Sequence, residues 1–187
     1  GTGTSGHYIP RLLEELLGTK FNIVTGYAGG NEIDIATERN EVVCRSFTTQ
    51  AYFSREPYHT WRKTNLVRIL MQTGERKDPQ LPDTPLLGDL MNEYKTPELS
   101  RRVATVMLGS GELGRPLVTH PATPPDRIKL LRDGFAKAMA DPALLEEAKQ
   151  KKLDITPVSG EQLTKIAKEV IDQPAEVVER IKKILAQ

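Results

Sequence analysis

The chain has 187 residues, enough to bury a sizeable core as one domain or as two small ones. Its 26 Lys and Arg residues against 25 Asp and Glu residues leave a formal net charge of +1, so no bulk field draws it to nucleic acid or to an anionic membrane. One cysteine excludes an internal disulfide framework, and there is no apolar run of the roughly 18 residues that span a bilayer.

The first half of the chain alternates between helical and strand patterns. Apolar residues recur at helical spacing from Ile9 to Leu17, and Gly18 is a natural stop. A second helix is expected near Asn31, which is a good N-cap. Segments rich in β-branched and aromatic residues predict strands at 20–27, 41–47 and 66–74. Strands alternating with helices favour an α/β fold with a mainly parallel sheet.

The second half of the chain is predicted to be mostly helical. A short extended segment at 115–125 contains four prolines and marks a change in composition at Arg115. We therefore expect two parts, an α/β lobe at 1–114 and a helical region at 115–187. Helices are predicted at 86–91, from Pro97 onward, and at 125–140, 142–151, 160–171 and 174–185.

The opening residues GTGTSGHY resemble two nucleotide motifs without completing either. Gly1, Gly3 and Gly6 have the spacing of a dinucleotide fingerprint. That motif also requires a preceding strand and an acidic residue near the end of the second strand, and this sequence shows neither. A phosphate-binding P-loop requires Lys and then Ser or Thr, where this chain has His7 and Tyr8. Both nucleotide interpretations fail at the residues that do the chemistry.

The feature that survives is a flexible backbone leading into a helix start. Free amide hydrogens and the positive end of the helix dipole favour an anion there. Thr4 and Ser5 could direct hydroxyls to a bound oxygen, or serve only as an ordinary N-cap. Gly29 and Gly30 repeat the arrangement before Asn31. Two such helix starts at one crevice predict a carboxylate cradle.

Longer stretches resemble a known family of transport receptors. The segment GTGTSGHYIPRLLEELLGTKFNIVTGYAGGNEIDIATERNEV resembles the second lobe of the Bug-type receptors, the extracytoplasmic solute-binding proteins of tripartite tricarboxylate transporters. Three later segments are similar to that family's carboxyl-terminal half in order and spacing. They are LPDTPLLGDL, GRPLVTHPATPPDRIKLLRDGFAKAMADPALLEEAKQKKLDITPVSGEQL and DQPAEVVERIKKI.

The resemblance implies a type II periplasmic-binding fold in which two α/β lobes close on a small carboxylate. It implies a periplasmic, non-enzymatic receptor without cofactor or metal, which passes its ligand to the membrane components of a transporter. It assigns ligand contacts to the first helix start, to the GYAGG turn and to the end of the following strand. These residues are Thr4, Ser5, Gly6, His7, Tyr27, Gly29, Gly30, Arg45 and Ser46.

Two departures from the family pattern affect these expectations. Family members reach the GTG stretch only after a signal peptide and a whole first lobe, so this chain is expected to be a fragment. Helices after Arg115 would then lack their usual partner, and a second copy of the chain is one way to cover them. Cys44, in the run VVCRS, stands near a position where relatives often have glycine and could reshape the pocket.

Other functional interpretations are weaker. His7, His59 and His120 are too scattered to predict a metal site. Cys44 beside Arg45 could be an activated thiolate, although most cysteines are small buried hydrophobic residues. The aromatic and basic loop at 48–65 is better explained as a cleft rim than as a nucleic-acid platform. The competing function is a small α/β enzyme acting on an acyl or phosphorylated substrate, which needs a nucleophile and a base that we cannot pair here.

Overall fold

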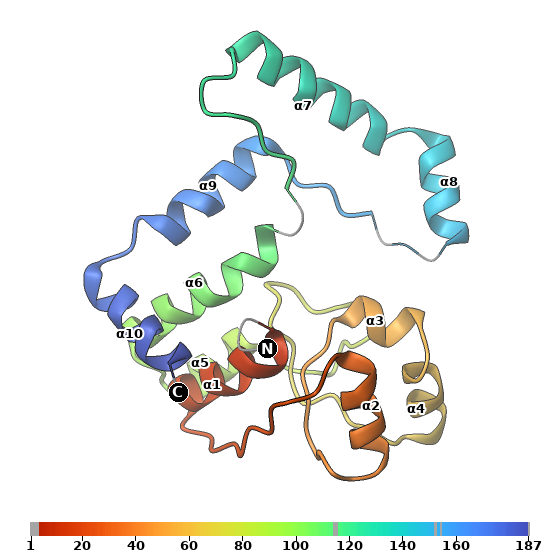
Figure 1. The fold of residues 1–187 in the computed structure, drawn as a ribbon, viewed down its shortest axis with the longest axis vertical. Coiled ribbons are helices and arrows are strands. Elements are labelled where there is room, and N and C mark those ends of the chain that lie inside the picture. Colours follow the sequence, from red (N-terminus) through yellow and green to blue (C-terminus); the bar gives the residue numbers. More distant parts are fainter. Residues whose placement is uncertain (1–3, 114–115, 152, 154, 187) are drawn as a thin grey trace. The chain divides into compact units, whose positions relative to one another are not determined.

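The computed structural model describes residues 4–113, 116–151, 153 and 155–186. It is 58% helical with 1% strand, and the residues that it describes form no sheet (Figure 1). The expected α/β architecture, and with it the type II periplasmic-binding fold, is therefore wrong for this structure.

The three segments predicted as strands lie outside the helices and do not pair with one another. Within the described ranges, the only bridge is an isolated parallel one between Gln72 and Leu86. Apolar residues of these segments remain open to solvent, with Val43 84% exposed and Leu70 55% exposed. A β-branched run favours extended backbone, but a sheet forms only when a neighbouring strand takes up its N–H and C=O groups. That partner is what these segments lack.

The helical predictions fare better. Gly18 ends the first helix in the left-handed conformation, with φ of 67°, as expected of a glycine that follows a helix. The segment at 48–65, expected to be a loop, contains two short helices instead. The helices are α1 Ser5–Leu17, α2 Gly30–Glu38, α3 Thr49–Ser54, α4 Tyr58–Thr64, α5 Leu87–Glu93, α6 Glu98–Leu113, α7 Pro125–Met139, α8 Pro142–Gln150, α9 Gly160–Ile171 and α10 Ala175–Leu185.

The chain divides into two compact units. Unit 1 comprises Gly1–Met107 together with Pro174–Gln187, and unit 2 comprises Leu108–Gln173. The carboxyl-terminal helix α10 therefore belongs to the same unit as α1. The boundary predicted at Arg115 lies outside the residues that the structure describes.

Unit 1 contains an aromatic cluster built by α3 and α4. Tyr52, Tyr58 and Trp61 are buried together, and Phe47 and Phe53 pack against them. The Tyr58 and Trp61 rings meet edge to face, with centroids 5.0 Å apart. Such edge-to-face contacts stabilise a core beyond the apolar area that they bury. This cluster is the support on which α2 is placed.

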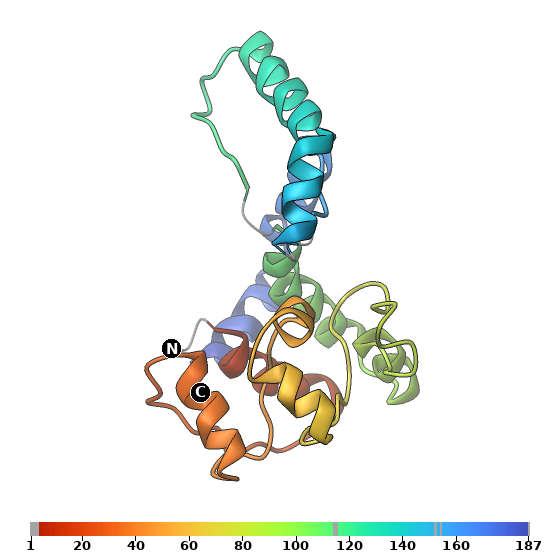
Figure 2. The same ribbon diagram turned by 90° about the vertical axis from the view of Figure 1, so that its right-hand side faces the viewer.

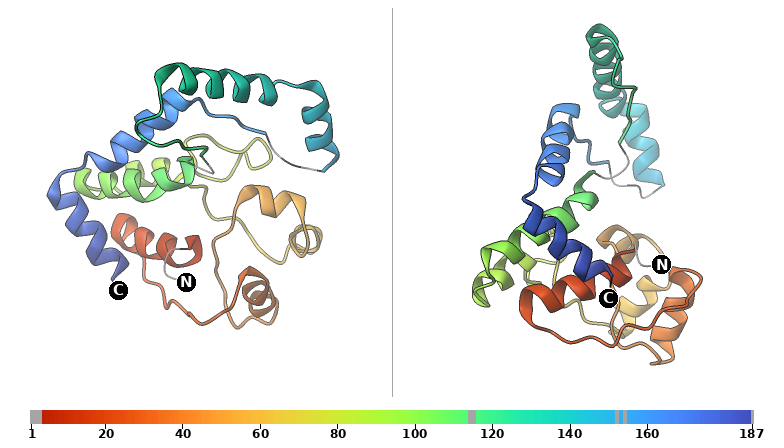
Figure 3. Two further views of the ribbon diagram at one scale, coloured as in Figure 1. Left: turned by 45° about the horizontal axis from the view of Figure 1, so that its top comes forward. Right: turned by 60° about the vertical axis from the view of Figure 1, so that its left-hand side comes forward.

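A second packed region of unit 1 joins its two ends. Helix α1 packs against α5 and α10, and Figure 3 shows α1 beside α10 in both views. Leu12 of α1, Leu87 of α5 and Val177 of α10 are each no more than 1% exposed. Apolar burial of this kind is the main source of stability for helices of this length.

A polar contact between Arg180 and Glu15 also joins α10 to α1. The Arg180 guanidinium donates to both carboxylate oxygens of Glu15, at 2.8 to 3.1 Å, and the Ser100 hydroxyl donates to the same carboxylate at 2.7 Å. The Glu15 side chain is 9% exposed, whereas that of Arg180 is 47% exposed. Because a bidentate pair has defined geometry, it sets the register between α1 and α10.

Unit 2 buries little of its apolar surface. Among its described residues only Gly109 and Ala148 are buried, and α7 and α9 contribute no buried side chain. Arg132 of α7 pairs with Glu161 of α9 at 2.5 Å. The Arg132 guanidinium also lies against Gly160, where an added Cβ would come within 2.5 Å of its Nε atom. Unit 2 therefore relies on polar contacts more than on a core.

We expect Arg180→Met to lower the free energy of unfolding by about 1–2 kcal/mol, because it leaves the mostly buried Glu15 carboxylate with one fewer partner. Urea unfolding followed by circular dichroism measures this. Lys182→Met is the matched control, since Lys182 pairs with the exposed Glu179 on the same helix. Equal effects of the two substitutions would contradict the proposed role of Glu15.

Candidate functional site

The first turn of α1 presents unpaired backbone donors. The amides of His7 and Tyr8 donate to the Thr4 carbonyl at 2.9 and 3.1 Å. The amides of Ser5 and Gly6 precede them and have no acceptor among the described residues, as helix geometry requires for a first turn. This turn contains no acidic side chain. It therefore combines free donors with an unopposed positive helix end.

The first turn of α2 lies beside that of α1, as Figures 1 and 2 both show. The N-cap of α2 is Gly29 rather than the expected Asn31. The helix therefore begins at Gly30, and Asn31 lies in its first turn. Glu32 occupies the first turn of α2, and its carboxylate lies close to Gly29. Because this carboxylate opposes an anion, α1 is the better donor of the two helix starts.

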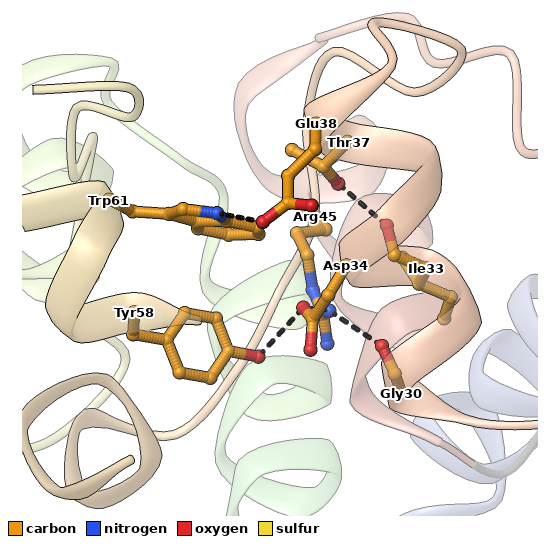
Figure 4. Close-up of polar contacts among 8 residues, drawn as sticks. All are labelled: Gly30, Ile33, Asp34, Thr37, Glu38, Arg45, Tyr58 and Trp61. Atoms are coloured by element: carbon orange, nitrogen blue, oxygen red, sulfur yellow. Dashed lines mark hydrogen bonds and ion pairs between the residues drawn. The ribbon is translucent and has the colours of Figure 1, made fainter. Parts of the chain in front are cut away.

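Arg45 connects the segment before α3 to the start of α2. Its Nη1 donates to the Gly30 carbonyl at 3.1 Å and forms an ion pair with Asp34. The Tyr58 hydroxyl donates to the same Asp34 oxygen at 3.0 Å (Figure 4). The side chains of Arg45 and Asp34 are 11% and 4% exposed, so this pair is nearly shielded from water.

A second hydrogen bond repeats the contact one helical turn further along α2. The Trp61 indole nitrogen donates to the Glu38 carboxylate at 2.9 Å, and Figure 4 shows Glu38 and Asp34 on the same side of α2, facing α4. Residues four apart share one helix face, which is why both carboxylates can reach α4. Together, Tyr58 and Trp61 hold α2 against the aromatic cluster.

The structure brings some of the expected site residues into contact and leaves others without a contact to one another. Gly30 and Arg45 are in contact, and the guanidinium that the family resemblance assigned to a ligand pairs through Nη1 with Asp34. Arg45 is therefore a positioning residue for α2. Tyr27 and Ser46 are half-buried, and neither side chain forms a hydrogen bond with a described residue. Gly1 and Gly3 of the opening motif lie outside the described residues.

Asp34, Glu38, Tyr58 and Trp61 were not among the expected site residues. The i, i+4 spacing of the two carboxylates and the i, i+3 spacing of the two aromatic residues could have indicated two facing stripes. Nothing in either pattern says which helix each stripe meets. Cys44, a candidate for reshaping the pocket, carries a free thiol and is exposed.

The environment of Tyr58 affects its ionisation. Burial of the phenol, together with its hydrogen bond to Asp34, raises the pKa of Tyr58 above its ordinary value, while the charge of Arg45 opposes this. The phenol therefore stays protonated in the folded chain and continues to donate to Asp34.

Two further properties concern the part of the chain that the structure describes. It contains no group of three or more His, Cys, Asp or Glu side chains that could hold an ion. None of its described helices is long and apolar enough to cross a bilayer.

Comparisons with known proteins add no further information. No family model matches the sequence, and no match was found among curated proteins or solved structures. The molecule is thus defined by its geometry alone: a helical chain of two units, with two adjacent helix starts in unit 1.

We expect Tyr58→Phe to lower the free energy of unfolding by about 1 kcal/mol at neutral pH through loss of the Asp34 hydrogen bond. The raised pKa of Tyr58 stabilises the fold fully below the ordinary tyrosine value of about 10, and this contribution is lost as pH rises toward the folded-state value. The wild type should therefore lose more stability than the variant above about pH 10.

Urea unfolding at neutral and alkaline pH tests this prediction. Tyr94→Phe serves as control because Tyr94 is 60% exposed. If the alkaline loss is the same in wild type and Tyr58→Phe, the phenol of Tyr58 does not couple to folding.

Proposed function

We propose that this chain is part of an extracytoplasmic solute receptor and binds a small carboxylate between the first turns of α1 and α2. The observation that carries the proposal is the pair of amides at Ser5 and Gly6, which have no acceptor among the described residues, in a helix start that contains no acidic side chain. A carboxylate that accepts from both amides satisfies the donors and the helix dipole together.

The first turn of α2 forms the second part of the proposed carboxylate site. Arg45 holds the Gly30 carbonyl, and Asp34 and Glu38 hold α2 on α4, so the first turn of α2 has a defined place relative to α4. Preorganised donors bind an anion more tightly because they lose little freedom on binding. The receptor function requires neither a catalytic residue nor a cofactor.

The wider role follows from the family resemblance. A receptor of this kind works in the periplasm and delivers its ligand to the membrane components of a tripartite transporter. The proposal concerns the binding site and does not require the two-lobed sheet fold, which the structure contradicts. The α/β fold of the competing enzyme is contradicted in the same way.

A proline substitution tests the amide donors directly. Proline is tolerated at the first position of a helix, where it removes only an N–H group without an intrahelical partner. The residue before it must be extended, and Thr4 already is, with φ of −94° and ψ of 153°. We expect Ser5→Pro to weaken carboxylate binding about 10-fold or more, while Ser5→Ala, which keeps the amide, weakens it less.

Binding is measured by thermal shift with mono-, di- and tricarboxylates, with phosphate and nucleotides as controls. A hundredfold excess over the dissociation constant stabilises the folded state by about 2.7 kcal/mol. The chain has one tryptophan, Trp61, whose bond to Glu38 on α2 makes its fluorescence a second readout. No response to any carboxylate, or an unchanged affinity in Ser5→Pro, would refute the proposed site.

Removing a negative charge from α2 is expected to strengthen carboxylate binding, whereas Ser5→Pro is expected to weaken it. Glu32 lies in the first turn of α2, so removing its charge lessens the repulsion of a bound anion. We expect Glu32→Gln to tighten carboxylate binding severalfold, and the gain to shrink as salt is added. Glu93→Gln, at the far end of α5, should leave the affinity unchanged. Weaker binding by Glu32→Gln would place the anion elsewhere.

A further inference from the structure

The segment 66–71, which follows α4, has the alternating exposure of a β-strand. Arg68 and Leu70 are exposed, whereas Val67 and Ile69 are half-buried and pack against the aromatic cluster. Successive side chains of an extended backbone point to opposite faces. The segment therefore has one face on the core of unit 1 and one face in solvent.

Both ends of this segment are anchored. At its start, the Leu66 amide donates to the Trp61 carbonyl at 3.0 Å. At its end lies the buried Gln72, whose amide donates to the Pro85 carbonyl at 2.9 Å. The Gln72 carbonyl accepts from the Leu87 amide at 2.8 Å. The segment is thus held in place on unit 1 before any partner binds.

The backbone between these anchors is unpaired. The N–H and C=O groups of residues 67–71 form no backbone hydrogen bond with any residue that the structure describes. Consecutive residues of an extended strand direct these groups to opposite edges, so Val67, Ile69 and Met71 face away from the edge that Gln72 uses. We call this their free edge. A row of unpaired donors and acceptors is a template for another extended chain.

The charge of the surrounding sequence indicates which kind of chain fits the free edge. The whole chain has a net charge of +1, but residues 62–77 contain five basic residues and one acidic residue, Glu75. The basic residues are Arg62, Lys63, Arg68, Arg76 and Lys77. None of them forms an ion pair with a described residue. This stretch is a local concentration of positive charge on a chain that is otherwise close to neutral.

We propose that the free edge binds an acidic, extended segment of another protein as an antiparallel strand. The partner's backbone then hydrogen-bonds to that of Val67 and Ile69, and a Glu or Asp of the partner lies directly opposite Arg68. Apolar partner residues two positions to either side cover Leu66 and Leu70. This mode of recognition takes its affinity from the main chain and its specificity from alternate side chains. The surface includes none of the residues of the proposed carboxylate site.

Two other occupants fit the free edge less well. A second copy of the chain would place two positively charged segments side by side, and like charges oppose association. A nucleic acid would use the positive charge but would leave Leu66 and Leu70, which are 48% and 55% exposed, without a partner. An acidic strand satisfies the charge, the backbone and the apolar side chains together.

A fluorescein-labelled peptide, Thr-Val-Thr-Glu-Thr-Val-Thr, tests the proposal by fluorescence anisotropy with the intact chain. Its Val, Glu and Val repeat at the spacing of Leu66, Arg68 and Leu70. We expect saturable binding of this Glu peptide and roughly 5-fold weaker binding of a Lys peptide, in which Lys replaces Glu. A Pro peptide, in which Pro replaces the two Thr residues beside Glu, keeps the charge but loses backbone donors. It should show no measurable binding.

A charge reversal in the protein tests the register. We expect Arg68→Glu to reverse the preference, so that it binds the Lys peptide more tightly than the Glu peptide. Arg68 is exposed, so the variant should fold, and circular dichroism checks this. Lys63→Glu is the matched control, because Lys63 is exposed and basic but lies in α4, before the segment. It should keep the wild-type preference.

Several outcomes would overturn the proposal while leaving the carboxylate site unaffected. They are no binding of the Glu peptide, equal binding of the Pro peptide, and an unchanged preference in Arg68→Glu. An equal effect of Lys63→Glu would reduce the interaction to general charge attraction. A dimer in analytical ultracentrifugation that Leu70→Glu dissociates would assign the free edge to a second copy. Tighter binding of oligothymidylate than of the Glu peptide would assign the surface to nucleic acid.

Discussion

The buried Asp34 carboxylate is the contact on which the proposed site depends. It forms an ion pair with Arg45 and accepts a hydrogen bond from the Tyr58 hydroxyl. These two contacts join α2 to the segment before α3 and to the aromatic cluster. A buried ion pair adds little net stability when formed, but breaking it exposes the full cost of an unpaired buried charge. Asp34 therefore specifies the position of α2 more than it stabilises the fold.

That position matters because the site is made from helix ends. In a sheet-based receptor, neighbouring strands align the loops that hold the ligand. Here the alignment comes from side chains: Asp34 and Glu38 fix α2 on α4, while α1 is held by α5, by α10 and by the Glu15 contact with Arg180. Helix starts offer an anion the same chemistry in either architecture, since the amides and the dipole belong to the helix itself.

The sequence predicted local structure well where the signals were local. The expected helix at 160–171 coincides with α9, and Gly18 ends α1 in the left-handed conformation. The predicted strands failed because their pattern describes a backbone preference, whereas a sheet needs partners distant in sequence. The segment 48–65 was expected to be a loop because of its polar residues, although its buried aromatic residues, Tyr52, Tyr58 and Trp61, form the core of two short helices.

The candidate site divides in the same way. The sequence by itself indicated a helix start with free amides close to Thr4 and Ser5, because helix starts depend on neighbouring residues only. It also identified Gly30 and Arg45 as candidates. Only the tertiary structure decided that Arg45 is held by Asp34, 11 residues away, that Tyr58 reaches Asp34 from 24 residues away, and that His7 is buried without a partner. Pairings over such separations depend on how helices pack, and that is set by the shape of the whole core rather than by any local pattern.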